Sequence, residues 1–233
     1  MVEFGLIPER ERPTRRIYVP SQGPDAWQAF LAKPDIHWRT GYSAKTLAFC
    51  WEEASGLPVE IKRMFGATAE LLLALPEHKV PLAGGRSDSQ NDVFALIRFD
   101  GQTSATMIEG KVNEPFGPTV GEWFATPSEG KIRRMRHLCE VLGLSAEPAA
   151  GIRYQLLHRT ASALIEARRF KTDEAAMLIH SFSPEAKWFD DFSAFSELFG
   201  IEVEAEKPAV VRMNSGQQLR LGWATGNPQF LAR

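Results

Sequence analysis

The sequence predicts an α/β protein in which helices flank a central mixed β-sheet. Apolar residues recur at helical spacing over residues 43–55 and 152–170. Apolar runs typical of strands cover residues 92–99, 103–111 and 174–182. The order is therefore helix, strand, strand–turn–strand, helices and strand, with a further helix and hairpin after them. This arrangement indicates helices on both faces of the sheet.

The length and composition indicate one globular domain covering residues 1–233. We place its core at about residues 43–182. An N-terminal strand and helix (15–33) and a C-terminal helix with a hairpin (184–224) are treated as additions. The formal net charge is −2, so no global field attracts a polyanion. Any contact with nucleic acid then needs a local basic patch.

The chain carries two cysteines, Cys50 and Cys139, in helix-like segments. We interpret both as buried thiols in a reducing cytosol. No CxxC pair or Cys/His array exists, so a structural zinc site is not expected. The N-terminal residues lack the pattern of a signal peptide, and no stretch approaches the about 18 apolar residues of a membrane span. We therefore expect a cytoplasmic protein with no membrane partner.

The elements ahead of the core are indicated by charge, proline and capping residues. Residues 1–14 are charged and contain proline, which is typical of an extended arm, and residues 15–20 resemble a short strand. Pro24 and Asp25 are favoured in the first turn of a helix, which we expect to end at about Lys33.

The next helix is predicted to begin at Ser43, a suitable N-cap, and to end at about Ser55, where Gly56 follows. Glu52 lies at the margin of its apolar face, whereas Glu53 points nearly opposite. Glu52 is therefore better placed to reach a site at the edge of the core. The apolar face consists of Ala44, Leu47, Ala48, Trp51 and Ala54.

Two helices and a strand are predicted between this helix and the hairpin. The helices cover residues 59–65 and 68–75, and the second contains Glu70 and is closed by Pro76. The strand covers residues 78–83.

The hairpin of strands 92–99 and 103–111 brings charged side chains together if it turns at Asp100-Gly101. Side chains alternate along a strand, so Glu109 and Lys111 project from the same face. The turn returns Asp92 to the neighbourhood of Glu109. Two carboxylates and an amine in such a cluster can hold a hard divalent cation and orient a water beside it.

Helices and strands continue beyond the hairpin. The helix at 128–142 has a strongly basic first half, residues 131–137, which is more typical of a solvated face than of a DNA contact. The remaining predicted elements are a helix at 152–170, a strand at 174–182, a helix at 184–199, and strands at 209–213 and 217–223 joined by Asn214-Ser215-Gly216.

The hairpin with Asp92 and Glu109-Gly110-Lys111, preceded by a helix with acidic residues and followed by a helix and a strand, resembles the PD-(D/E)XK nuclease superfamily. The run Ser89–Phe94 also resembles the segment that leads into the metal-binding aspartate of restriction-type members. The resemblance covers about residues 43–182 as an order of elements. Asn91 is a departure, because the motif has proline there. The resemblance implies a restriction-endonuclease-like αβββαβ core.

The resemblance also implies a site for Mg²⁺ or Mn²⁺. Asp92 and Glu109 would ligate the ion, and the carbonyl of Gly110 would complete the ligand set. Lys111 would position or deprotonate the attacking water and stabilise charge on the phosphate. The implied activity is hydrolysis of phosphodiester bonds, with DNA as the nucleic-acid partner.

Further site residues are expected on neighbouring elements. The family's helical carboxylate maps to Glu52, with Glu53 and Glu70 as alternatives. Residues on the long helix could touch a phosphate or form a solvated face, and those before Asp92 could orient it or cap a turn. The candidate phosphate or substrate contacts are Gln90, Gln155, His158 and Arg159.

Three functions are compatible with these residues. The first is a metal-dependent nuclease, for which a homodimer would supply the two sites that double-strand cutting needs, although no residue indicates one. The second is a catalytically silent nuclease-fold module in a partner complex, with the aromatic C-terminal region as its interaction surface. The near-neutral charge favours it somewhat. The third is a small-molecule enzyme with the same acidic pocket, but nothing marks a cofactor.

Overall fold

The computed structural model describes residues 22–85 and 87–233, so the predicted arm at 1–14 and the strand at 15–20 lie outside the described residues. A six-stranded sheet forms its centre, in the order β1-β2-β3-β4-β6-β5. The first three strands are antiparallel, β4 and β6 run parallel to β3, and β5 is antiparallel to β6. The strands are β1 (Glu70–Val80), β2 (Ser89–Phe99), β3 (Gln102–Lys111), β4 (Glu174–Ser181), β5 (Ala209–Arg212) and β6 (Gln218–Thr225).

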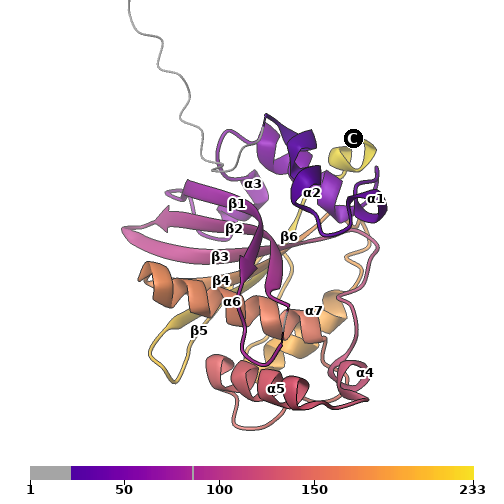
Figure 1. The fold of residues 1–233 in the computed structure, drawn as a ribbon. Coiled ribbons are helices and arrows are strands. Elements are labelled where there is room, and N and C mark those ends of the chain that lie inside the picture. Colours follow the sequence, from indigo (N-terminus) through magenta and orange to yellow (C-terminus); the bar gives the residue numbers. More distant parts are fainter. Residues whose placement is uncertain (1–21, 86) are drawn as a thin grey trace, which may run out of the picture.

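Helices lie on both sides of this mixed sheet, as predicted (Figure 1). Short helices and α2 cover one face, and the longer α5 and α6 cover the other. No helix in the described part of the chain has the length and apolarity needed to span a bilayer. The helices are η1 (Pro24–Phe30), α1 (Pro34–His37), α2 (Ser43–Glu53), α3 (Val59–Arg63), α4 (Val120–Phe124), α5 (Glu129–Leu142), α6 (Tyr154–Phe170), α7 (Phe189–Ser196), η2 (Glu197–Phe199) and η3 (Pro228–Ala232).

The sheet divides the apolar core into two layers, because successive side chains of a strand point to opposite faces. In the layer under α2 and α3, strand residues pack against Leu47, Trp51 and Ile61. In the layer under α5 and α6, their neighbours in sequence pack against Leu138 and Leu157. The strand residues of the first layer include Val93, Ile108 and Leu178, and those of the second include Phe94, Met107 and Met177.

The predicted helix at 68–75 is wrong, because residues 70–75 form the first part of β1. Glutamate, leucine and alanine favour a helix locally, but pairing with β2 decides the outcome here. The predicted strand 78–83 is the end of the same strand, which stops at Val80. β1 is an edge strand, so Pro76 is tolerated within it despite its missing N–H.

Smaller differences concern helix ends. Tyr42, not Ser43, is the N-cap of α2, and the backbone N–H of Ser43 donates instead to the Glu114 carboxylate at 3.0 Å. The predicted helix at 184–199 begins only at Phe189 and ends in the 3-10 turn η2. The predicted helix up to Lys33 is the 3-10 helix η1, which ends at Phe30.

Candidate functional site

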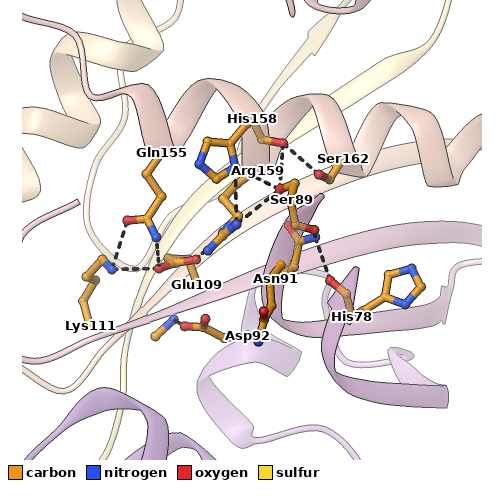
Figure 2. A network of polar contacts seen from close by, with 12 residues as sticks. His78, Ser89, Asn91, Asp92, Glu109, Lys111, Gln155, His158, Arg159 and Ser162 are labelled. Atoms are coloured by element: carbon orange, nitrogen blue, oxygen red, sulfur yellow. Dashed lines mark hydrogen bonds and ion pairs between the residues drawn. The ribbon is translucent and has the colours of Figure 1, made fainter. Parts of the chain in front are cut away.

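The β2–β3 hairpin turns at Asp100 and Gly101, both of which have positive φ values of 46° and 77°. This is the geometry that a two-residue hairpin requires. The pairing places Asp92 beside the end of β3, where its Oδ2 accepts a hydrogen bond of 2.8 Å from the backbone N–H of Gly110. The structure therefore brings Asp92 next to the Glu109-Gly110-Lys111 segment (Figure 2).

Glu109 is the centre of a buried charged network and is only 3% exposed. Its Oε1 accepts from the Lys111 Nζ at 2.7 Å and from the Gln155 Nε2 at 2.8 Å. Its Oε2 accepts from the Arg159 Nε at 2.6 Å. Burial alone would raise the pKa of Glu109, but the charges of Arg159 and Lys111 outweigh burial and lower it. Glu109 is therefore an ionised carboxylate in the core.

Helix α6 supplies the other half of this network (Figure 2). Gln155 and Arg159 are four residues apart, so they lie one above the other on the face toward β3. The Arg159 Nη1 donates to the Ser89 Oγ at 3.2 Å and lies 3.3 Å from the His158 Nδ1. The two predicted contacts Gln155 and Arg159 thus reach Glu109 directly.

His158 is held as a neutral hydrogen-bond donor. A guanidinium can only donate, so the His158 Nδ1 accepts from Arg159 and from the Ser89 hydroxyl at 2.9 Å. The ring proton therefore sits on Nε2. Burial and the nearby charges of Arg159 and Arg134 lower the pKa of His158 well below its ordinary value. The network assigns this tautomer, and the Nε2–H, which has no partner among the described residues, remains for a ligand.

A cavity of about 540 Å³ opens onto these residues, which is within the range of small-molecule and substrate sites. Charged side chains line one side of the cavity. Apolar side chains from the segment between η1 and α2 and from the loop after β3 line the other side. Its lining includes the predicted residues Gln90, Asp92, Glu109, Lys111, Gln155, His158 and Arg159, together with Glu77, Glu114, Leu31, Ile36 and Phe116.

Glu77 is a cavity residue that the sequence did not indicate. It lies on β1 between the pairs Pro76–Val93 and His78–Asn91, and hence opposite Asp92. Its φ of 52° is unusual for a residue other than glycine, and its Oε2 accepts from the Gln90 Nε2 at 2.6 Å. Recognition of residues 70–80 as one strand paired with β2 would have placed it there.

The two facing carboxyl groups share an unfavourable environment. Burial and then the charge of Asp92 raise the pKa of Glu77 to about 8. Burial and then the charge of Glu109 raise the pKa of Asp92 to about 7. Like charges at close range disfavour joint ionisation, so a proton or a cation would stabilise this pair.

The structure does not bring the predicted helical carboxylates into the cavity. The Glu52 Oε1 accepts from the Trp27 indole N–H at 2.8 Å, since the margin of α2 on which it lies faces η1. Glu53 pairs with Arg233 at 2.9 Å, and Glu70 pairs with Arg98 at the far end of β1. None of these three described residues lines the cavity. Glu77 and Glu114 are additional carboxylates that do.

A second cluster lies on the α2 side of the sheet. Among the described residues, the potential ligand atoms of Cys50, Glu60 and His180 come within 4.8 Å of one another. The Trp51 indole, which can only donate, lies 3.3 Å from the His180 Nδ1, and the His180 Nε2 is 2.8 Å from the Glu60 carboxylate. The proton on Nε2 blocks that nitrogen as a ligand, so the cluster is a buried hydrogen-bonded network.

Comparisons with known proteins place the chain in a family but give no activity. Neither a curated protein nor a solved structure matches it. A family model described as Domain of unknown function (DUF6946) matches residues 20–228, which is most of the chain. The chain therefore belongs to the DUF6946 family.

Proposed function

We propose that this protein is a metal-dependent nuclease that hydrolyses phosphodiester bonds in DNA. The observation that carries the proposal is the convergence of Asp92, Glu109 and Lys111 in one cavity. The succession α2, β1, β2, β3, α6 and β4 supports the likeness to a restriction-endonuclease-like αβββαβ core. The near-neutral net charge of the chain limits the long-range electrostatic contribution to DNA binding.

The donor set suits a hard divalent cation. Asp92 and Glu109 offer carboxylate oxygens, which Mg²⁺ and Mn²⁺ prefer, and the carbonyl of Gly110 is the third ligand that the resemblance implies. Glu77 takes the place that was expected for Glu52, because it faces Asp92 across the β1–β2 ladder. When bound, the ion would neutralise phosphate charge and lower the pKa of a water.

The Lys111 ammonium group is held in one position beside the proposed reacting groups. Its Nζ donates to Glu109 and to the Gln155 Oε1 at 3.3 Å, and it lies 4.9 Å from the centroid of the Phe116 ring. Only 3% of the residue is exposed, so few alternative positions are open to it. In this proposal Lys111 orients the attacking water and stabilises negative charge that develops on the phosphate.

Residues of α6 would bind the phosphate. Arg159 offers a planar set of donors that matches phosphate oxygens, and His158 offers its Nε2–H. Gln155 keeps Lys111 and Glu109 in place, since its amide bonds to both.

A cleavage assay with Mg²⁺ or Mn²⁺ on single-stranded DNA, double-stranded DNA and RNA tests the proposal. Lys111→Ala and Asp92→Ala should each lower the rate by about 10²-fold or more, because Lys111 stabilises charge on the reacting phosphate and Asp92 would hold the metal ion. Lys79→Ala is the matched control, since Lys79 is an exposed lysine of β1. Unchanged activity in both site variants would sink the assignment.

A catalytically silent binding module is the second candidate. The three hydrogen bonds that Lys111, Gln155 and Arg159 donate to the Glu109 carboxylate favour it, since these donors compete with a metal ion. Calorimetric titration with Mn²⁺ separates the two functions. Absence of binding at millimolar Mn²⁺ supports the silent module, whereas binding that disappears in Glu109→Ala supports the nuclease.

A further inference from the structure

The carboxylates of Glu109 and Asp92 differ in the number of hydrogen bonds that they already accept. Both oxygens of Glu109 accept hydrogen bonds, with Arg159 as the donor to Oε2. Asp92 uses Oδ2 for the Gly110 N–H, and its Oδ1 has no hydrogen-bond partner among the described residues. A cation at the Glu109 Oε2 would lie close to the Arg159 guanidinium, whose Nε is 2.6 Å from that oxygen, so repulsion between the two positive charges favours movement of Arg159 when a cation binds.

Arg159 is the donor that can exchange partners. Lys111 is enclosed by Glu109, Gln155 and the Phe116 ring. Arg159 lines the cavity, and its Nη2 has no hydrogen-bond partner in the described part of the chain. A guanidinium with a donor to spare at a cavity wall is suited to a phosphate, which it binds through two parallel hydrogen bonds.

We propose that Arg159 couples phosphate binding to cation binding in this site. The inference rests on the proposed function, since it assumes that the cavity takes both ligands. In the ligand-free protein Arg159 is the counter-cation of Glu109. A phosphate group in the cavity takes over the guanidinium and leaves the Glu109 Oε2 for a divalent cation. Each ligand therefore strengthens the binding of the other, and linkage requires the same factor in both directions.

Calorimetric titration measures this factor with Mn²⁺ and thymidine 3′,5′-bisphosphate, which has no phosphodiester bond to cut. In the wild-type protein, saturating bisphosphate should increase the affinity for Mn²⁺ by roughly 5- to 150-fold, after subtraction of a protein-free titration. Mn²⁺ should increase the affinity for the bisphosphate equally. In Arg159→Gln, Mn²⁺ alone should bind more tightly than in the wild type, and the factor should fall close to one.

Arg168→Gln is the matched control, because Arg168 is an exposed arginine of the same helix, and it should retain the wild-type factor. Arg159→Lys serves if the glutamine variant does not give a folded circular dichroism spectrum. Lysine keeps the positive charge but lacks the paired donors of a guanidinium. The coupling factor of this variant should therefore lie below that of the wild type.

Two results would overturn the coupling. One is a wild-type factor of one, including the case in which Mn²⁺ does not bind. The other is an Arg159 variant with the wild-type factor. The cleavage assay is read separately: activity that depends on Lys111 and Asp92, together with a factor of one, removes this inference but keeps the nuclease.

Discussion

At the scale of single residues, the facing carboxyl groups of Glu77 and Asp92 make stability depend on pH. Both pKa values are higher in the folded protein than the ordinary 4.5 and 3.8, reaching about 8 and about 7. These two groups therefore bind more protons in the folded state than in the unfolded state between about pH 4 and pH 8. Their contribution to the free energy of unfolding consequently falls as the pH rises through this range.

Glu77→Gln should remove part of this dependence. At pH 9 we expect the variant to exceed the wild type by about 1–2 kcal/mol in the free energy of unfolding, a figure reduced for partial solvent screening, and at pH 4 to match it. Urea denaturation at both pH values measures the difference. Asp88→Asn, at an exposed carboxyl group, should leave stability within about 0.5 kcal/mol at either pH. An advantage of Glu77→Gln that is equal at pH 4 and pH 9 would contradict this origin.

At the scale of elements, the connection from β1 to β2 is fastened to α5. The Arg134 guanidinium, on α5, donates to the carbonyls of Leu82, Ala83 and Ser87. Gly84 has a φ of 83°, and a Cβ added there would come within 2.2 Å of the Arg134 backbone nitrogen. The close approach of loop and helix therefore requires glycine at this position.

Gly84→Ala should destabilise the protein by about 2–4 kcal/mol, because it adds a backbone clash to the cost of a left-handed conformation. Gly216→Ala is the matched control, since Gly216 has a φ of 84° and nothing within 4 Å of an added Cβ. It should cost only about 1 kcal/mol. Thermal unfolding of the two variants gives the comparison, and equal losses would show that the contact with α5 is unimportant.

At the scale of the whole molecule, the C-terminal hairpin is part of the central sheet. β6 lies between β4 and β5, and its Leu219, Leu221 and Trp223 are fully buried in the layer under α5 and α6. Residues 184–224 thus contribute more than an addition to the core, because without β6 strand β4 would be paired on one side only, with β3.

A chain that ends at residue 208 should lack a cooperative thermal transition, because it exposes one edge of β4 and a large part of one core layer. A chain that ends at Thr225 keeps β6 and should unfold cooperatively at a lower temperature, since it loses the packing of Phe230 and Leu231 and the Glu53–Arg233 ion pair. Circular dichroism melts of both chains test this. A sharp transition in the shorter chain would refute the role assigned to β6.

Local patterns indicated the parts of the site that lie on one strand or one turn. Alternation placed Glu109 with Lys111, and the Asp100-Gly101 turn returned Asp92 to them. The surroundings of Glu52 depend on which element packs against its side of α2, and that element is η1. The apolar periodicity of a helix does not show which element this will be. Glu77 was missed because leucine-rich β1 has helical propensity and gains its strand structure from β2.

The parallel pairing of β3 with β4 also bears on synthesis of the chain. Glu109 and Lys111 lie on β3, but β4, which pairs alongside both of them, ends 70 residues after Lys111, at Ser181. During synthesis the charged hairpin is therefore made before β4 is available to pair with it. Long-range parallel pairing also forms late in folding. The charged hairpin therefore gains the pairing of β3 with β4 only after a further 70 residues have been synthesised.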